Sequence, residues 1–393
     1  MFYEQITDWQ QRLPESSWAS FSGVDVERVL ARETLRPQDL AILLSPAALS
    51  YLEPMAKKAQ ALTIRNFGRT MGLFTPLYLA NFCSNQCVYC SFHAGNKIIR
   101  RKLTVEQAIK EGEAISSTGL QHLLLLTGES RTQSGPAYME ECVRALRPMF
   151  ASLGLEVYPL STGEYRRLYE AGIDSVTLFQ ETYDEITYAE VHPAGPKRNY
   201  HYRLEAPDRA CEAGISSVNI GALLGLSDWR RDAFYSALHA DYLQRNYPGV
   251  EVSISVPRLR PYAGSFNSSA APVTDGALVQ IILAYRLFLP RAGLTLSTRE
   301  SPQMRENLLP LGITRLSAGS LTSVGGYSET DNIGSAQFQI ADERPVPEVV
   351  RMIRAKGYLP AFCDWVNMRE RNGVGHESFN SRTGRNVETG TIS

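Results

Sequence analysis

The sequence predicts an α/β fold, a (β/α)8 barrel of TIM type with a helical extension before it and a cap after it. At 393 residues the chain suits one large barrel with appendages, or two or three ordinary domains. From about residue 75, eight short apolar, β-branched or aromatic runs alternate with longer stretches of helical period. Two of these stretches end in Ala-Gly-Ile, at 171–173 and 213–215, which is typical of a helix that ends at glycine and leads into a strand. The alternation favours the barrel.

The eight apolar runs are the predicted strands of the barrel. They are Pro76–Phe82, His122–Gly128, Glu156–Leu160, Ser175–Gln180, Val218–Leu224, Val252–Arg258, Leu294–Arg299 and Thr314–Ala318. The helical pattern between them covers Val105–Ser117, Tyr138–Leu153, Tyr165–Ala171, Arg203–Ala213 and Ala277–Leu289. Active sites of this fold gather at the C-terminal ends of the strands. The polar residues that end these runs are therefore the candidate functional residues.

The chain divides into three predicted parts. Residues 1–74 hold acidic and aliphatic helical patterns, with Pro37 and Pro46 as expected helix starts or breaks, and predict a helical N-terminal extension. Residues 75–320 are the predicted barrel. Residues 321–393 predict a C-terminal cap that contains a helix at Val346–Lys356 and ends in a polar tail.

Composition and charge exclude several classes of protein. Lys and Arg number 40 against 41 Asp and Glu, so no net basic field attracts nucleic acid or an anionic membrane. Hydrophobic content of 44% with 21% charged residues is ordinary for a globular protein and excludes disorder. The first residues lack the charged and apolar regions of a signal peptide, and the apolar runs are too short to span a bilayer. We expect a cytoplasmic protein that acts on a small molecule.

Three of the six cysteines lie close together at the end of the first predicted strand. Cys83, Cys87 and Cys90 have the spacing C-x3-C-x2-C, which suits a loop around an iron-sulfur cluster or a zinc ion. Three thiolates leave one iron of a four-iron cluster open to a non-protein ligand. A zinc site would need a fourth ligand, for which His93 is near enough, but zinc motifs usually come as two separated pairs. The scattered Cys142, Cys211 and Cys363 are expected to be small buried residues.

The cysteine motif, with the aromatic Tyr89 before the third cysteine, resembles the signature of the radical S-adenosylmethionine (SAM) superfamily. The resemblance implies a 4Fe-4S cluster on Cys83, Cys87 and Cys90, with S-adenosyl-L-methionine on the open iron and Tyr89 beside it. In that superfamily the reduced cluster cleaves SAM to methionine and a 5′-deoxyadenosyl radical. The protein then supplies orientation and exclusion of water.

Other strand ends match positions at which the superfamily binds SAM. Gly128 and Glu129 lie where a Gly-Gly-Glu-like turn holds the methionine amine, with Thr127 in place of the first glycine. Glu181 occupies the position of an acid that binds the ribose hydroxyls, and Arg203 that of an arginine that pairs with the methionine carboxylate. Taken alone, Glu181 would more often be a helix cap and Arg203 a surface ion pair. Their joint placement around one cofactor favours the functional interpretation.

Within the superfamily, several short sequence segments resemble those of the aromatic amino acid lyases, and above all those of the tyrosine lyases of thiamine thiazole biosynthesis. These segments are Phe179–Tyr183, His192–Lys197, Gly221–Leu226, Asp228–Arg230, Ser297–Glu300 and Leu316–Ser320. The implied reaction cleaves the Cα–Cβ bond of L-tyrosine to 2-iminoacetate (dehydroglycine) and p-cresol, while SAM becomes 5′-deoxyadenosine and methionine. A hydrogenase maturase begins with the same cleavage but carries further C-terminal cysteines, whereas here that region holds Cys363 alone.

Substrate residues are predicted from charge and from the lyase resemblance. A free amino acid needs its carboxylate held by two hydrogen bonds, which an arginine at a strand end does best, and Arg299 is our choice. Ser317, and after it Ser320, is expected to support the carboxylate or the amine, as a serine does in the tryptophan-cleaving relative. Tyr78 resembles a tyrosine near the substrate amine in that relative, although packing in the barrel core would explain it equally well.

Partners follow from the implied chemistry. Because 2-iminoacetate hydrolyses readily, the resemblance implies transfer to thiazole synthase, and a flavodoxin- or ferredoxin-type reductant to feed the cluster. Neither nucleic acid nor membrane is expected. The alternatives are a lyase acting on tryptophan or, as in hydrogenase maturation, on tyrosine in another pathway, a non-catalytic iron-sulfur carrier, and a zinc-stabilised barrel of unrelated chemistry.

Overall fold

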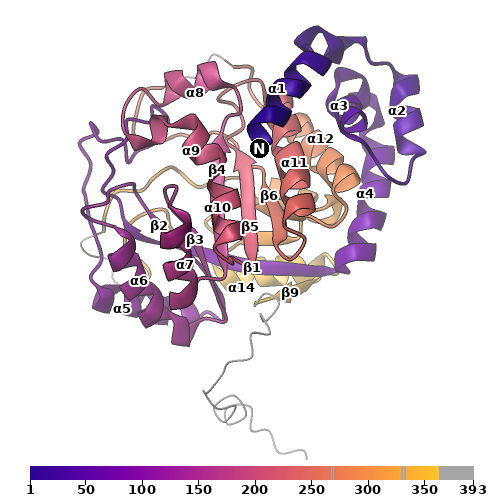
Figure 1. The fold of residues 1–393 in the computed structure, drawn as a ribbon. Helices are drawn as coiled ribbons and strands as arrows, with labels where there is room; N and C mark the ends of the chain where they lie inside the picture. Colours follow the sequence, from indigo (N-terminus) through magenta and orange to yellow (C-terminus); the bar gives the residue numbers. More distant parts are fainter. Residues whose placement is uncertain (267, 269, 329–330, 332, 363–393) are drawn as a thin grey trace, which may run out of the picture.

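The strands close into a parallel barrel because β1 pairs with β8 on one side and β2 on the other (Figure 1). The computed structural model describes residues 1–362 apart from 267, 269, 329, 330 and 332. The barrel strands are β1 (Thr70–Ala80), β2 (His122–Thr127), β3 (Ser152–Glu156), β4 (Ser175–Glu181), β5 (Ser217–Ala222), β6 (Glu251–Ser255), β7 (Gly293–Leu296) and β8 (Arg315–Ser317). The predicted (β/α)8 barrel is confirmed.

The third strand differs from its prediction. β3 ends at Glu156, where the sequence pattern places its start, and α6 (Pro136–Leu146) is shorter than the predicted helix. Pro148, in a short 3-10 turn after α6, lacks an amide hydrogen and disfavours helix at the residue before it. The apolar residues of β3 then pair with β2 and β4. Glu156 therefore stands at the end of the barrel where active sites form.

Helices surround the barrel in the predicted alternation. They are α5 (Val105–Ser116), α6, α7 (Thr162–Ala171), α8 (Glu185–Val191), α9 (Tyr200–Leu204), α10 (Ala206–Glu212), α11 (Trp229–Asn246), α12 (Asp275–Phe288) and α13 (Pro302–Leu308). Side chains cap several of them; Thr104 and Ser161, for example, accept hydrogen bonds from amides in the first turns of α5 and α7. The glycines that follow α7 and α10, Gly172 and Gly214, have φ of 128° and 96°, which favours glycine.

The N-terminal helices pack against one side of the barrel, next to α11 and α12 (Figure 1). They are α1 (Phe2–Arg12), α2 (Gly23–Leu30), α3 (Pro37–Leu44) and α4 (Leu52–Phe67). Pro37 begins α3 and Pro46 begins a 3-10 turn, as predicted. The buried Gln280 amide of α12 donates to the carbonyls of Leu43 and Ser45, which fixes α3 to the barrel.

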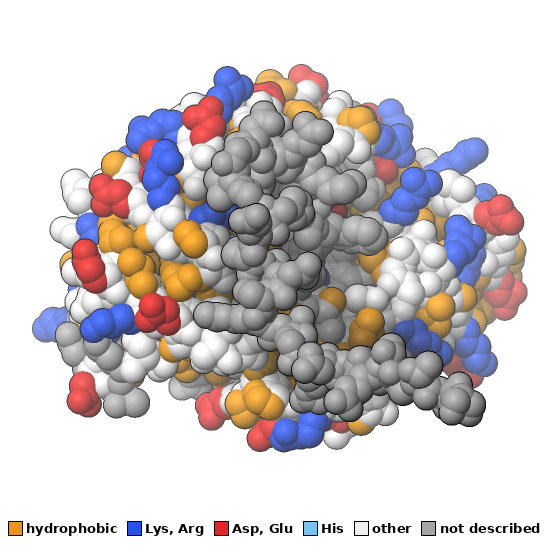
Figure 2. Space-filling view, turned by 90° about the horizontal axis from the view of Figure 1, so that it is seen from below, with side chains coloured by type: hydrophobic (Ala, Val, Ile, Leu, Met, Phe, Trp, Pro, Cys, Tyr) orange, Lys and Arg blue, Asp and Glu red, His pale blue; other side chains and the backbone are white. Residues whose placement is uncertain are grey.

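The chain after β8 returns to the barrel through α14 (Val346–Ala355) and β9 (Leu359–Ala361), and β9 pairs with the first residues of β1. β1 begins at Thr70, inside the predicted N-terminal extension. The division of the chain into parts at residues 1–74, 75–320 and 321–393 stays a prediction. Within the described residues, no helix is both long and apolar enough to cross a membrane. Figure 2 shows the molecule from below, where described side chains of both charge signs are interspersed, as the net charge of −1 suggests.

Candidate active site

Two adjoining cavities lie at the C-terminal ends of the strands. One, of about 1000 Å³, is lined by Cys83, Cys87 and Cys90 and is called the cysteine cavity here. The other, of about 910 Å³, extends into the barrel and is called the barrel cavity. The residues that line both cavities are Tyr78, Leu126, Glu156, Thr177, Phe179, Arg299 and Phe338.

The cysteine loop follows β1 directly and is held by backbone contacts. The amide and hydroxyl of Ser84 both donate to the carbonyl of Glu129, at 2.8 and 2.9 Å. Burial raises the pKa of the Cys87 thiol to about 12 and also raises that of Cys90. Thiolates at these positions therefore need a cationic partner, which iron supplies.

A single zinc ion on the three cysteines would need a fourth ligand, for which the sequence offers His93. Among the described residues, no three His, Cys, Asp or Glu side chains form a group that could hold a metal ion. The Nδ1 atom of His93 instead accepts a hydrogen bond from the Gly95 amide at 2.8 Å. Three thiols that line one cavity fit a cluster, in which each thiolate binds a different iron.

The turn after β2 fits a polar cofactor beside the cysteine loop. A Cβ atom at Gly128 would lie 2.3 Å from the Phe82 carbonyl oxygen, so only glycine allows this close approach. The buried Thr127 hydroxyl lines the cysteine cavity and has no hydrogen-bond partner among the described residues. A bound molecule with an amine or carboxylate, such as SAM, would satisfy that hydroxyl. Glu129 also lines this cavity, and its carboxylate accepts from Asn85 at 2.6 Å.

Glu181 and Arg203 meet in the wall of the cysteine cavity. Glu181 accepts from Arg203 Nη2 at 3.3 Å and from Lys197 Nζ at 2.6 Å. Burial alone would raise the pKa of Glu181, but Lys197 and Arg203 hold it below its usual value. Arg203 is 6% exposed, so it is not a surface pair, and Asp184 rather than Glu181 caps α8.

The backbone is strained at Glu181. Glu181 has φ of 73°, the one positive value at a non-glycine among the described residues, and the register between β4 and β5 shifts there. Such conformations persist where the surroundings enforce them, and they cluster at ligand sites. The strained turn aims the carboxylate at the cavity wall.

The Tyr89 hydroxyl is held by His192 rather than by a residue of the cysteine loop. Its hydroxyl lies 2.7 Å from Nε2 of His192, whose Nδ1 lies 2.8 Å from the Tyr188 carbonyl. Because a carbonyl only accepts, Nδ1 carries the hydrogen and Nε2 accepts from Tyr89. Burial lowers the pKa of His192 to about 3, so the ring is neutral. Tyr89 is thereby fixed in the wall of the cysteine cavity.

Arg299 reaches from the end of β7 to the border between the cavities. Its guanidinium stacks on the Phe338 ring at 3.5 Å, and no carboxylate of the described residues forms an ion pair with it. Burial lowers its pKa, although a guanidinium stays charged. Of the other cations near this end, Arg258 binds Glu300 and Asp275, and Lys197 binds Glu181. Arg299 is thus available to an anionic ligand.

Ser317 and Ser320 line the barrel cavity beside Arg299. The Ser317 hydroxyl accepts from the Thr298 amide at 3.0 Å, whereas the buried Ser320 hydroxyl has no partner in the described part of the chain. Ser320 is therefore at least as well placed as Ser317 to bind a ligand. Tyr78 lines both cavities, packs edge-on against Phe92, and donates its hydroxyl to Gln337 at 2.7 Å.

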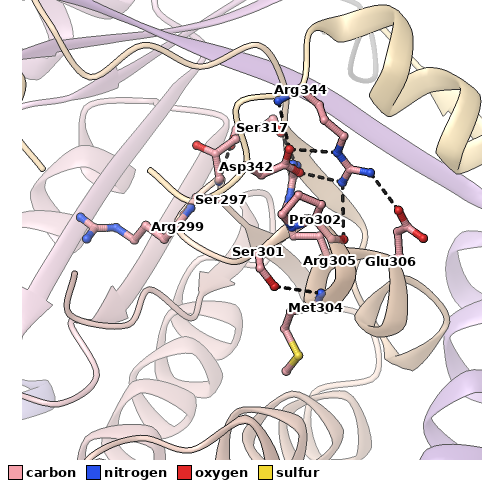
Figure 3. Close-up of polar contacts among 11 residues, drawn as sticks. Ser297, Arg299, Ser301, Pro302, Met304, Arg305, Glu306, Ser317, Asp342 and Arg344 are labelled. Atoms are coloured by element: carbon pink, nitrogen blue, oxygen red, sulfur yellow. Dashed lines mark hydrogen bonds and ion pairs between the residues drawn. The ribbon is translucent and has the colours of Figure 1, made fainter. Parts of the chain in front are cut away.

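A buried ion network supports the ends of β7 and β8 (Figure 3). Arg305 of α13 binds Asp342 and the Ser317 carbonyl, and Arg344 also binds Asp342. The Asp342 amide donates to the Thr298 carbonyl at 3.1 Å. Figure 3 shows the Arg299 side chain pointing away from this network. The network therefore fixes the strand ends without binding the Arg299 side chain, whose Nη1 donates to the Arg258 carbonyl at 3.5 Å.

Sequence reasoning missed Glu156 as a site residue and considered Lys197 only as a substitute for Arg299 on the substrate carboxylate. Glu156 lines both cavities, and its carboxylate makes no hydrogen bond within the described residues. The available signal was that Glu156 is a polar residue directly after the apolar run at 153–155. Because the third strand was predicted to begin at Glu156, this residue was not recognised as the end of a strand. Burial raises the pKa of Glu156 to about 7, although the nearby Arg299 acts to lower it.

We expect Glu156→Gln to stabilise the cofactor-free protein at alkaline pH. The folded-state pKa is raised, so below about pH 4.5 the carboxyl is neutral in both states and has no effect on stability. Above pH 7 its buried charge costs up to roughly 3 kcal/mol, which glutamine removes. Melting temperatures at pH 8 and pH 5 measure this, with the exposed Glu113→Gln as control. A Glu156→Gln variant less stable than wild type at pH 8 would contradict the assignment.

Comparisons with known proteins agree with this site. Residues 77–238 match the family described as the radical SAM superfamily, and residues 255–359 match the Biotin and Thiamin Synthesis associated domain. The fold and the three-cysteine site thus define a radical SAM enzyme. Its cofactors are a 4Fe-4S cluster and SAM, as predicted from the motif.

Similarity to individual proteins indicates the family within the radical SAM superfamily. The chain is 43% identical to the 2-iminoacetate synthase of Escherichia coli (strain K12), over 88% of this chain and 91% of that protein. The FeFe-hydrogenase maturase HydG from Carboxydothermus hydrogenoformans is 33% identical, with a TM-score of 0.81 over 92% of this chain and 83% of that one. Methylornithine synthase, at 22% identity and a TM-score of 0.68, shares the fold. The chain belongs to the family of the 2-iminoacetate synthases.

Proposed function

We propose that this protein is a tyrosine lyase that cleaves the Cα–Cβ bond of L-tyrosine to 2-iminoacetate and p-cresol for thiamine thiazole biosynthesis. Similarity to the 2-iminoacetate synthase over most of both chains supports the proposal. The structural observation that carries it is Arg299, a half-buried guanidinium without a carboxylate partner among the described residues, beside the cysteine cavity. A half-buried cation without a carboxylate partner, next to a cofactor site, fits the carboxylate of a free amino acid.

Different residues of this chain would bind the cofactors and the substrate in the two cavities. Cys83, Cys87 and Cys90 would hold the cluster, and Glu181 and Arg203 would hold SAM by its ribose and carboxylate. When bound, these cofactors supply a 5′-deoxyadenosyl radical, which can take a hydrogen atom from the substrate amine. The lining residues then serve to position the substrate and exclude water.

In the barrel cavity, Arg299 would bind the tyrosine carboxylate through two parallel hydrogen bonds, and Ser317 or Ser320 would support it. Tyr78 would contact the amine. After Cα–Cβ cleavage, the 4-hydroxybenzyl radical takes up one electron and one proton to become p-cresol, and the amino acid remainder is 2-iminoacetate. The enclosing walls keep this imine from water until it leaves.

An anaerobic turnover assay tests the proposed function. The reconstituted enzyme is mixed with dithionite, SAM and tyrosine, tryptophan or phenylalanine, and the products are identified by mass. We expect p-cresol and 2-iminoacetate, or its hydrolysis product, from tyrosine alone. Cleavage of tryptophan instead would assign a different lyase, and a cluster without any 5′-deoxyadenosine formation would indicate an iron-sulfur carrier.

Replacing the buried arginine tests the SAM site separately. We expect Arg203→Ala to weaken SAM binding by roughly 2–5 kcal/mol, because the SAM carboxylate loses its charged partner and Glu181 loses one of its two. Iron content should stay normal. Equilibrium binding of SAM measures the loss, and exposed Arg198→Ala is the matched control. Unchanged affinity in Arg203→Ala would make the arginine purely structural.

Two partners belong to the same proposal. Thiazole synthase would receive 2-iminoacetate directly, because the free imine hydrolyses, and a flavodoxin- or ferredoxin-type protein would reduce the cluster in the cytoplasm. Adding thiazole synthase to the assay should lower the yield of hydrolysed imine per p-cresol formed. An unchanged yield would argue against direct transfer.

A further inference from the structure

The chain segment after β8 supplies two adjacent side chains to the wall between the cavities. Gln337 lines the cysteine cavity, and Phe338 lines both cavities. Backbone hydrogen bonds fix this segment from two sides: the Gln337 amide donates to the Thr322 carbonyl at 2.9 Å, and the Ser91 amide donates to the Gln337 carbonyl at 3.3 Å. The segment is therefore tied to the residue that follows Cys90.

The side chain of Gln337 connects Tyr78 to Cys90. The Tyr78 hydroxyl donates to Oε1 of Gln337 at 2.7 Å, and Nε2 of Gln337 donates to Sγ of Cys90 at 3.7 Å. The oxygen end of an amide accepts and the nitrogen end donates. The tyrosine hydroxyl therefore sets the orientation of the amide and leaves its NH2 group facing the sulfur.

The neighbouring side chain contacts the other end of the substrate region. Phe338 lies under the Arg299 guanidinium at 3.5 Å, and the Thr322 hydroxyl donates to the Phe338 carbonyl at 2.8 Å. One dipeptide thus touches both Tyr78 and Arg299, the proposed substrate residues, and also a cluster cysteine.

We propose that Gln337 is a positioning residue that couples occupancy of the barrel cavity to the reduction potential of the cluster. A hydrogen bond donated to a cysteine sulfur stabilises the more negative, reduced cluster and so raises its potential. Tyrosine held on Arg299 and packed against Tyr78 and Phe338 restrains all three side chains, which keeps the amide on Cys90. The tyrosine-dependent half of this inference rests on the proposed function.

The consequence is protection against wasteful chemistry. With the barrel cavity empty, Tyr78 and Gln337 move more freely, the hydrogen bond to sulfur is weaker on average, and the cluster is harder to reduce. With tyrosine bound, the potential rises and reduction becomes easier. SAM is then cleaved mainly when a substrate is present to react.

The test compares reduction potentials rather than activity. Gln337→Leu removes the amide at similar volume, and Gln339→Leu makes the same change at an exposed side chain two positions away. Midpoint potentials of the reconstituted, SAM-bound proteins are measured by electron paramagnetic resonance redox titration, with and without tyrosine. We expect a lower potential in Gln337→Leu and no rise on adding tyrosine, whereas Gln339→Leu matches wild type.

Two results would overturn the inference. Equal potentials for Gln337→Leu and wild type without tyrosine would remove the role of the hydrogen bond, and an intact tyrosine-induced rise in Gln337→Leu would remove the coupling. If Gln337→Leu fails to retain iron, Gln337→Glu serves instead, since it still accepts from Tyr78 but, when ionised, cannot donate to sulfur. Should wild type form no p-cresol while Gln337→Leu still lowers the potential, the proposed function fails and the hydrogen-bond role stands.

Discussion

We expect serine at Cys83, Cys87 or Cys90 to abolish 5′-deoxyadenosine formation and to lower bound iron. The three thiols line one cavity on one loop after β1, and each is expected to bind a separate iron. A serine hydroxyl is a much poorer ligand for iron than a thiolate, so one loss leaves a second iron without a protein ligand. Iron analysis, the visible absorbance spectrum and the yield of 5′-deoxyadenosine measure this result.

The matched controls are Cys142→Ser and Cys211→Ser. Both thiols are buried, Cys142 in α6 and Cys211 in α10, and neither lines the cysteine cavity. These variants should keep wild-type iron and SAM cleavage, although burying a hydroxyl costs some stability. Loss of iron in either control as complete as in Cys90→Ser would refute the ligand assignment. Cys363, the remaining candidate, lies outside the described residues.

The second large effect concerns Arg299→Lys. Lysine keeps the charge but loses the planar fork that holds a carboxylate through two hydrogen bonds, and it loses the flat stacking on Phe338. One lost charge-assisted hydrogen bond of ~1.5–3 kcal/mol corresponds to roughly 10- to 100-fold in kcat/KM for tyrosine. Uncoupled SAM cleavage should survive in part, because the cysteine cavity keeps its own residues. The ratio of p-cresol to 5′-deoxyadenosine therefore falls.

Exposed Arg291→Lys is the matched control and should keep the wild-type ratio. If both products fall together in Arg299→Lys at an unchanged ratio, Arg299 is not a substrate ligand. The structure leaves few replacements, because Arg258 is paired with Glu300 and Asp275, and Lys197 is paired with Glu181. Such a result would direct attention to Arg260, which lines the cysteine cavity and whose buried Nε has no partner in the described chain.

The sequence by itself determined the barrel and the cluster loop, because both depend on residues close together in the chain. Alternating apolar runs define strands locally, and Cys83, Cys87 and Cys90 need only one loop to reach a shared cavity. The predicted third strand was wrong because apolar residues before Glu156 fit helix and strand patterns alike, and pairing with β2 and β4 decided between them. No local pattern carried that information.

Only the tertiary structure decided how the cavities are completed. Lys197 meets Glu181, and Phe338 lies under Arg299, through contacts between segments that the sequence keeps apart. Gln337 reaches Tyr78 and Cys90 across 259 and 247 positions. The physical reason is that a side chain becomes buried or unpaired through neighbours brought together by strand closure and by the return of the chain after β8. Residue type indicates which chemistry is possible, but the partners that a charge gains or lacks depend on the closed barrel.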